Sequence, residues 1–462
     1  MDADTLSSNA VCIRNEIDWF RQTMELRFKL HAAGNQKGDP FREIEPPDLN
    51  GCGSYYASVV QRFDMGCPER LVLILSYIPH VRPDVLDPFF IQNQSIQRRF
   101  TEFGGLTGLA HGGFLPTGET AMFLLAGNSI QQRLRFDSLF SHEHYFYINN
   151  ILRLNQPHPE EPRLSSLLQL TPEYLERLTT GRAYHPPFSP EFPAQLLTTL
   201  YEWADLVLDA PTYQKIEDIA TWVRHQHTIM EDWMLKKRIK PGFRSLFYGP
   251  PGTGKTLTAC LLGKVTGSSV YRIDLSKIVS KYIGETEKNL ASLFDQAQHQ
   301  NWILFFDEAD SLFGKRTESH SANDRAANQQ VSYLLQRIED FPGVVILATN
   351  LRSHLDDAFA RRFQSMIHFP LPGFEQRLRL WEDNFKDKPY RLAADVDLRK
   401  LASDYELPGG SIVNVLRYAC LKAVVRTPRE IRAQDLLRGV RNELHKEGKF
   451  LKQQNQDSVM RG

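Results

Sequence analysis

The chain has 462 residues and a mass of 53.2 kDa, which allows about two or three domains. Hydrophobic residues make up 42% and charged residues 24% of it, as in ordinary globular proteins, and its 55 basic and 55 acidic residues cancel. This balance argues against a nucleic-acid-binding surface, and no apolar run is long enough to cross a bilayer. Five scattered cysteines lack the spacing of zinc sites or disulfide frameworks, so we expect a reduced, cytoplasmic protein.

The N-terminal region, residues 1–155, carries apolar residues at helical spacing. Helices are predicted over about 9–33, 55–63 and 69–78, with charged residues between the apolar ones. The stretches 119–125 and 145–154 fit a helix or a strand equally well. We expect a mainly helical α+β region that is winged-helix-like in part.

Residues 156–195 differ in composition from their surroundings because they are rich in proline. The prolines of this segment are Pro157, Pro159, Pro162, Pro172, Pro186, Pro187, Pro190 and Pro193. Proline at this density disfavours long helices, so we expect a surface connector with one short helix near 173–178. The next domain begins at about residue 196, and a long helix is predicted from 212 to about 237.

A glycine-rich motif follows a short apolar strand at 244–248 and precedes a helix that begins near Leu257. Its sequence is Gly249-Pro250-Pro251-Gly252-Thr253-Gly254-Lys255-Thr256. The order strand, loop and helix is typical of phosphate loops, in which backbone N–H groups and the helix N-terminus bind phosphate oxygens. Lys255 is expected to reach the β- and γ-phosphates of ATP, and the Thr256 hydroxyl to bind Mg²⁺. The alternative, a flexible Gly/Pro turn, does not account for the flanking strand and helix.

Two later apolar strands end in polar residues. The run 303–306 leads into Asp307 and Glu308, and the run 344–348 leads to Asn350. Continuous apolar runs indicate parallel strands buried on both faces, and ligands bind at the carboxyl ends of such strands. Asp307 is therefore a candidate magnesium ligand, Glu308 a candidate base for the attacking water, and Asn350 a candidate γ-phosphate contact. Solvent-exposed strand ends are the alternative.

These motifs together resemble the AAA clade of the AAA+ ATPases, which includes spastin, katanin and FtsH-type ATPases. The resemblance covers about residues 196–450. It implies an α/β P-loop module over 196–372 with a five-stranded parallel sheet between helices. It also implies a helical lid and tail over 373–462, and a ring, usually hexameric, with ATP at the subunit interfaces.

The same resemblance implies roles for residues outside the strand ends. Arg361 and Arg362 would act as arginine fingers on the ATP of the neighbouring subunit, unless they are simply solvated. The backbone near Asp205 would contact the adenine edge, and the segment with Gly410 and Ser411 would close over adenine. We assign no lid arginine that senses phosphate.

A further stretch is similar to the first pore loop of protein-translocating rings. In it Lys281 and Ile283 flank Tyr282, whose aromatic ring would grip an extended polypeptide in the channel; ordinary packing is the alternative. Residues 314–328 resemble a second pore loop, in which Asp324 and Arg325 resemble a pair that connects neighbouring subunits, or else a solvated charged face.

Three classes of function compete. A protein remodeller is favoured by the pore-loop resemblance and by the absence of a basic surface. A nucleic-acid motor lacks a recognisable binding signature, and a scaffold without turnover would not need Glu308. The N-terminal region would recruit the protein substrate. Its combination with this ATPase core resembles ATPases encoded beside bacterial contractile injection particles, so a particle component is a candidate partner.

Overall fold

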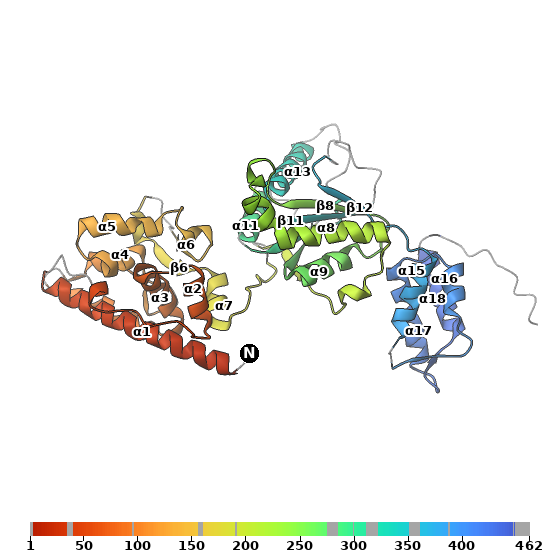
Figure 1. Cartoon of the computed structure of the whole chain (residues 1–462), viewed down its shortest axis with the longest axis horizontal. Helices are drawn as coiled ribbons and strands as arrows, with labels where there is room; N and C mark the ends of the chain where they lie inside the picture. Colours follow the sequence, from red (N-terminus) through yellow and green to blue (C-terminus); the bar gives the residue numbers. More distant parts are fainter. Residues whose placement is uncertain are drawn as a thin grey trace, which may run out of the picture. The chain divides into compact units, whose positions relative to one another are not determined.

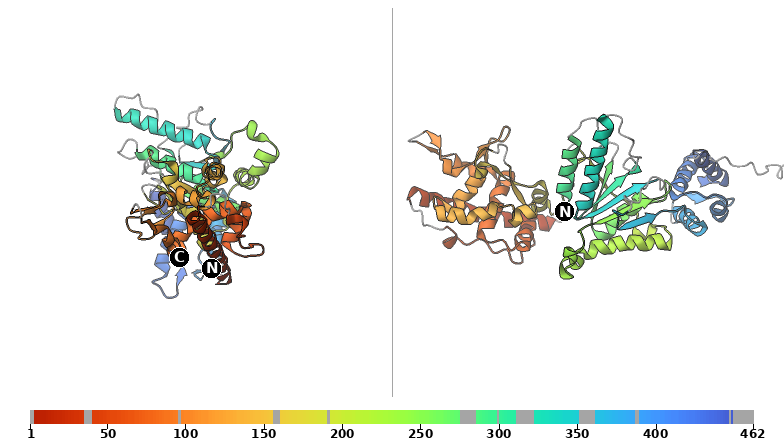
Figure 2. Two further views of the ribbon diagram at one scale, coloured as in Figure 1. Left: turned by 90° about the vertical axis from the view of Figure 1, so that its left-hand side faces the viewer. Right: turned by 90° about the horizontal axis from the view of Figure 1, so that it is seen from above.

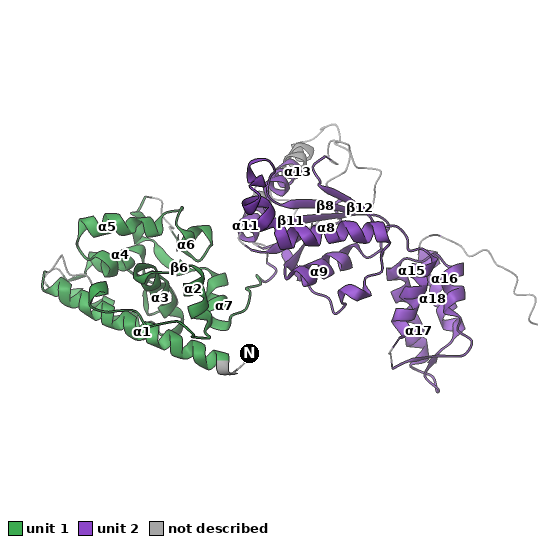
Figure 3. Ribbon diagram, in the orientation of Figure 1, with its two compact units in different colours: residues 1–186 green, residues 187–462 purple. Residues whose placement is uncertain are grey.

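The computed structural model separates the chain into two compact units, residues 1–186 and 187–462 (Figures 1 and 3). It describes residues 3–34, 40–94, 97–155, 160–189, 192–274, 285–298, 300–310, 322–350, 361–386, 389–446 and 448. Each unit has its own hydrophobic core, and each is described separately below.

The first unit is mainly helical. Its helices are α1 (Ala3–Ala32), α2 (Tyr55–Arg62), α3 (Cys67–Val81), α4 (Gly118–Ala126), α5 (Ile130–Phe136), α6 (Tyr145–Ile148) and α7 (Pro172–Thr180). Its strands form antiparallel pairs: β1 (Gln92–Asn93) with β2 (Arg98–Arg99), β3 (Leu106–Thr107) with β4 (Phe114–Leu115), and β5 (Leu152–Asn155) with β6 (Leu167–Leu170). The stretch 119–125 is thus helical, and 145–154 divides into a short helix and a strand.

Helices α3 and α4 lie in the centre of this unit and are buried along most of their length. The long helix α1 is attached to them by charged side chains. Arg27 donates hydrogen bonds to the carbonyl oxygens of Leu124 and Leu125, both at 2.9 Å, and so caps the end of α4. Glu16, which is fully buried, accepts a hydrogen bond from Arg70 of α3. A buried carboxylate needs such a partner, because an unpaired charge in the core costs several kcal/mol.

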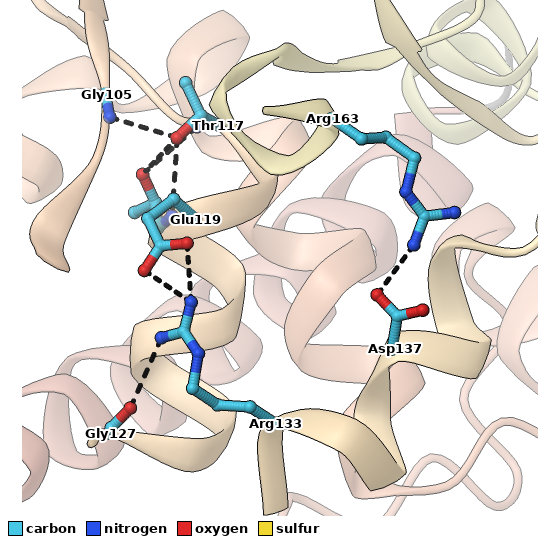
Figure 4. A network of polar contacts seen from close by, with 8 residues as sticks. Gly105, Thr117, Glu119, Gly127, Arg133, Asp137 and Arg163 are labelled. Carbon is cyan, nitrogen blue, oxygen red and sulfur yellow. Dashed lines mark hydrogen bonds and ion pairs between the residues drawn. The ribbon is translucent and has the colours of Figure 1, made fainter. Parts of the chain in front are cut away.

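Polar contacts join the glycine-rich stretch before α4 to the start of that helix (Figure 4). Gly105 has φ +84°, and its N–H donates to the Thr117 hydroxyl at 3.0 Å. A Cβ atom there would lie 2.1 Å from the Phe114 ring, so only glycine fits. Beyond the turn, the Arg133 guanidinium donates to both carboxylate oxygens of Glu119 at 2.6 Å and so ties α5 to α4.

The expected surface connector over 156–195 is wrong for much of its length, although its short helix near 173–178 is confirmed as α7. Strand β6 pairs with β5, and helix α7 packs into the core of the first unit through Tyr174 and Leu178. Pro172 is in the first turn of α7, where its missing N–H is tolerated. The prediction relied on the density of proline, whereas its effect depends on the position of each proline within an element.

The second unit contains a six-stranded sheet in the order β12-β8-β11-β10-β9-β7. Its strands are β7 (Ala194–Leu197), β8 (Phe243–Tyr248), β9 (Ser269–Asp274), β10 (Trp302–Asp307), β11 (Val344–Thr349) and β12 (Ser365–His368). Five strands are parallel, as expected, but β7 adds an antiparallel edge strand beside β9. The sixth strand was missed because it crosses the expected boundary between the proline-rich segment and the next domain.

Helices cover both faces of this sheet (Figure 2). Helices α8 (Ala210–His227) and α9 (Lys255–Thr266) pack on one face. Helices α11 (Glu285–Ala297) and α13 (Ala322–Asp340) pack on the other. Two-sided cover explains why the central strands have continuous apolar runs. The predicted helix over 212–237 ends earlier, since α8 passes into a π-helical turn, η7 (Thr228–Asp232).

The C-terminal part of this unit is a small helical lid, as expected from the sequence. It contains α15 (Phe374–Phe385), α16 (Leu398–Asp404), α17 (Gly409–Ala423) and α18 (Ala433–Lys446), with the short pair β13 (Arg391–Leu392) and β14 (Glu430–Ile431). Its core is built around Trp381, which is fully buried. Nowhere in the described part of the chain does a helix combine the length and the apolar character needed to cross a membrane.

An ion pair of the lid gives a prediction about stability and pH. Asp435 is buried in the first turn of α18, and Arg426 donates to its two oxygens at 2.5 and 2.6 Å, which lowers the pKa of this carboxyl group. Its ionised form therefore stabilises the fold at neutral pH, and this contribution is lost as the pH falls through the lowered pKa. We expect Asp435→Asn to destabilise the lid by about 2 kcal/mol at pH 7.

The measurement is urea unfolding, followed by hydrogen exchange of the α17 and α18 amides. The difference between the variant and the native protein should shrink below the ordinary carboxyl pKa of 3.8. Asp404→Asn is the control, since Asp404 is exposed at the end of α16. An effect of Asp435→Asn that is the same at every pH would contradict the charge argument.

Candidate functional site

Three neighbouring parallel strands bring the predicted site residues to one edge of the sheet. Strand β11 lies between β8 and β10 and is parallel to both. The loop from Gly249 follows β8, Glu308 follows β10 and Asn350 follows β11. Because parallel strands end at the same edge, residues from three distant parts of the sequence converge there.

The glycine-rich loop has the backbone geometry of an anion cradle. Gly249, Gly252 and Gly254 have φ of +147°, +75° and +99°, conformations that disfavour other residues. A Cβ atom at Gly249 would lie 2.2 Å from the carbonyl oxygen of Phe369, so the loop also passes close to the chain after β12. Helix α9 follows directly and has no side-chain cap, which leaves its first N–H groups free for an anion.

Lys255 lies at the centre of the site. Its Nζ donates to the carbonyl oxygens of Gly249 at 2.7 Å and Pro250 at 3.0 Å, and to Oδ1 of Asn350 at 2.9 Å. The side chain is buried, with 8% exposed. Burial lowers the pKa of the Lys255 ammonium, and the carboxylates of Asp307 and Asp310 oppose this shift. The contact joins the glycine loop to the end of β11.

The two acidic residues after β10 have different surroundings. Asp307 forms an ion pair with Arg272 of β9 at 3.1 Å. Glu308 is exposed and has φ +54°, and its N–H donates to Oδ1 of Asp307 at 3.0 Å. A left-handed backbone costs a non-glycine residue about 1–2 kcal/mol, so the surrounding fold holds Glu308 in this position.

The donor set fits a nucleotide triphosphate with magnesium. Lys255, the glycine backbone and the uncapped end of α9 suit phosphate oxygens, while Thr256, which is half-buried, and Asp307 offer oxygen ligands. Among the described residues no group of three or more His, Cys, Asp or Glu could hold a metal ion. Magnesium held by Thr256 and Asp307 would complete its shell with phosphate oxygens and water.

The lid touches the glycine loop directly. The N–H of Gly410, at the start of α17, donates to the carbonyl oxygen of Gly252 at 2.9 Å, and Ser411 follows in the same turn. Asp205 accepts a hydrogen bond from the N–H of Glu202 at 2.6 Å, so its carboxylate fixes the turn η6 (Trp203–Asp205). Arg379 of the lid donates to the Ala204 carbonyl at 2.7 Å and binds this turn as well.

Other predicted site residues lie apart from this cluster or outside the described part of the chain. Arg361 is exposed, and Nε of Arg362 lies 2.6 Å from the Glu339 carboxylate. Leu257 is half-buried in the first turn of α9. The candidate pore loop Lys281, Tyr282 and Ile283 lies outside the described residues, as does the 314–321 part of the second loop; the remainder, 322–328, begins α13.

Sequence reasoning missed three polar partners of the site. These are Arg272, Asp310 and Thr349. Arg272 pairs with Asp307, and the Thr349 hydroxyl donates to the Asp310 carboxylate. The only signal for Arg272 is a basic residue between the apolar residues Tyr271 and Ile273 of strand β9. Thr349 and Asp310 become neighbours only when β11 and the end of β10 lie side by side.

Comparison with known proteins agrees with this geometry. Residues 245–371 match the family described as "ATPase family associated with various cellular activities (AAA)". This range begins in β8 and ends just after β12, so it contains the glycine loop, Asp307 with Glu308, and Asn350. The second unit therefore contains an AAA ATPase domain, a nucleotide-binding α/β fold.

The relatives of the chain are AAA ATPases and related nucleotidases. It is 35% identical over 203 residues to the proteasome-activating nucleotidase of Archaeoglobus fulgidus, covering 42% of this chain and 50% of that protein. It is 32% identical over 237 residues to a katanin p60 ATPase-containing protein of Danio rerio, covering 47% of this chain and 48% of that protein. The chain thus spans about half the length of these relatives.

The close approach at Gly249 gives a prediction about stability. Gly249→Ala would place a methyl group against the Phe369 carbonyl at a positive φ, so we expect it to destabilise the second unit by about 3 kcal/mol. Gly267→Ala is the matched control, since Gly267 also has a positive φ (+68°) but no atom within 4 Å of the place that a Cβ would take. We expect that control to cost about 1 kcal/mol. Urea unfolding measures both, and equal losses would refute the steric argument.

Proposed function

We propose that this protein is an ATP-hydrolysing ring ATPase that unfolds or disassembles protein substrates by pulling polypeptide through a central pore. The observation that carries this proposal is the convergence of the glycine loop, Lys255, Asp307, Glu308 and Asn350 at one sheet edge. This is the set of groups that phosphoryl transfer to water requires: phosphate binding, metal binding, a base, and a γ-phosphate contact.

The residues have separate roles in this proposal. Lys255 binds the β- and γ-phosphates in place of its present contacts with Gly249 and Pro250. Thr256 and Asp307 hold magnesium, which when bound neutralises charge on the phosphates. Glu308 accepts the proton of the attacking water, and Asn350 orients that water or the γ-phosphate. Residues 249–257 form the phosphate-side contacts, while the adenine lies between the turn at Asp205 and the lid at Gly410 and Ser411.

In this proposal a neighbouring subunit of the ring provides the arginines that complete each ATP site. Arg361 is exposed after β11 and suits contact with a neighbouring subunit. Arg362 would have to exchange its ion pair with Glu339 for a phosphate, so its availability depends on assembly. A guanidinium that reaches the γ-phosphate accelerates hydrolysis by about three to five orders of magnitude. We infer a homo-oligomer, a hexamer by resemblance, whose sites are complete only between subunits.

The substrate is proposed to be a protein. Two kinds of relative support this: the archaeal ones are proteasome-activating nucleotidases, and others are katanin ATPases. Lys281, Tyr282 and Ile283 would contact the translocating chain, and the first unit would recruit it, in a cytoplasmic setting. A component of a bacterial contractile injection particle is the more specific candidate for the substrate.

Replacing the proposed base Glu308 should trap the protein in a complex with its substrate. Glu308→Gln keeps the size of the side chain but removes its ability to accept a proton, so ATP binding should persist while turnover falls about 10²- to 10⁴-fold. Affinity purification of this variant with ATP, followed by mass spectrometry, should recover protein substrates. Glu382→Gln, at an exposed lid position, is the control. Recovery of nucleic acid instead of protein would contradict the proposed substrate class.

If Arg361 and Arg362 act on the neighbouring subunit, two inactive variants should restore activity when they are mixed. Lys255→Ala removes the phosphate contact from a subunit's own site, and Arg361→Ala with Arg362→Ala removes the groups given to a neighbour. Each variant alone should lose ATPase activity. A mixture should regain part of it, because an intact Lys255 site can then receive arginines from a Lys255→Ala neighbour. The measurement is ATPase rate against mixing ratio, and a mixture no more active than its parts would place the arginines in their own subunit's site.

A further inference from the structure

Two cysteines that lie far apart in the sequence meet in the first unit. Cys12 belongs to α1 and is buried, with 2% exposed. Cys52 lies in the turn before α2, where it is partly exposed and packs against the same hydrophobic core. The Cys52 thiol and the Ser54 hydroxyl are both within hydrogen-bond reach of the Cys12 sulfur. Two thiols in contact need little backbone movement to reach the geometry of a disulfide.

Helix α1 holds the start of α2 through the side chains that flank Cys12. Asn9 and Glu16 lie on the same face of α1 as Cys12, because they are three and four positions away from it. The N–H of Tyr56 donates to Oδ1 of Asn9 at 3.2 Å, and the Tyr56 hydroxyl donates to Glu16 at 3.4 Å. The contact between the two thiols is therefore fixed by hydrogen bonds on both sides of Cys12.

The turn that carries Cys52 is anchored at its ends and has room to adjust in between. The N–H of Cys52 donates to the Leu49 carbonyl at 3.3 Å, and its own carbonyl accepts from the N–H of Ser54 at 2.8 Å. Gly51 and Gly53 flank it, and a Cβ atom at either glycine would have no atom within 4 Å. Small changes in the backbone angles of these glycines can thus bring the Cys52 sulfur to bonding distance without a clash.

The two thiols differ in their access to a dissolved oxidant. Burial raises the pKa of the Cys12 thiol to about 11, and the hydrogen bond from Ser54 opposes this shift. Cys52 and Glu16 add to the shift, although Glu16 is itself paired with Arg70. The thiolate is the reactive form of cysteine, so Cys12 is inert toward an oxidant in solution at neutral pH. The partly exposed Cys52 is the thiol that such an oxidant reaches first.

We propose that Cys12 and Cys52 form a reversible disulfide when the chain meets a small disulfide oxidant such as oxidised glutathione. Cys52 loses its proton, and its sulfur attacks the oxidant to form a mixed disulfide and release one glutathione, which takes up a proton. Cys12 then gives its proton to solvent, and its sulfur attacks that of Cys52 and displaces the second glutathione. Two protein thiols are oxidised, and one oxidant disulfide is reduced to two thiols. The product links α1 to the turn before α2.

The experiment uses the full chain, fully reduced and then equilibrated with glutathione at different ratios of its oxidised and reduced forms. Remaining thiols are blocked with an alkylating reagent, and the chain is digested with trypsin without reduction. Trypsin cleaves after lysine and arginine, so mass spectrometry should find peptide 1–14 joined to peptide 43–62. Excess reduced glutathione should reverse the link. Cys52→Ser should abolish it, whereas Cys67→Ser, at another partly buried position beside the same core, should leave its yield unchanged.

A second measurement separates a pair positioned by the fold from a chance encounter of two thiols. The equilibrium with glutathione gives the effective concentration of one thiol beside the other, which should be at least about tenfold higher in the folded chain than in urea. The link should therefore also raise the urea midpoint of the first unit. The proposal is overturned if the two effective concentrations are equal, or if Cys52 forms only the mixed disulfide at every ratio. It is also overturned if peptide 63–70, which contains Cys67, replaces peptide 43–62 in the linked product.

Discussion

The organisation of the second unit depends on how a single ammonium group is held. Lys255 is buried, and burial of an unpaired charge would cost several kcal/mol. Oxygens from Gly249, Pro250 and Asn350 surround Nζ at 2.7–3.0 Å and offset that cost. These oxygens follow two different strands, so the contact fixes the glycine loop against the end of β11. A phosphate group would compete for the same ammonium, which links nucleotide binding to the position of Asn350.

The sheet separates two kinds of surface. Its carboxyl edge carries the phosphate-binding loop and the acidic pair Asp307 and Glu308, and the lid reaches this edge through Gly410. Near its amino edge, Glu231 and Lys236 pair with each other at 2.9 Å. The continuous apolar strands between the two edges exclude water, so the polar groups at one edge are separated from those at the other.

In the first unit, buried charged side chains join neighbouring helices. Helices α1, α3 and α4 contribute to its core, and the charged side chains that join these helices are themselves buried. Arg27 satisfies carbonyl groups at the end of α4 that would otherwise lack partners, and Arg70 neutralises Glu16. Burial raises the pKa of the Glu16 carboxyl, while Arg70 opposes this shift, so the pair is required for an ionised Glu16 in the core.

The sequence by itself determined the nucleotide-binding module. The glycine motif, the acidic pair and Asn350 each follow an apolar strand, and parallel strands buried on both faces leave a local pattern that needs no knowledge of distant contacts. The helical character of α1 and α3 was likewise encoded in local sequence, whereas the lid was expected from the family resemblance. Only the tertiary structure decided that 163–180 belongs to the first unit and that β7 joins the sheet. It also revealed the ion pair between Arg272 and Asp307. These features depend on pairing between residues far apart in the chain, and the physical chemistry of such pairs leaves no periodic trace in one sequence.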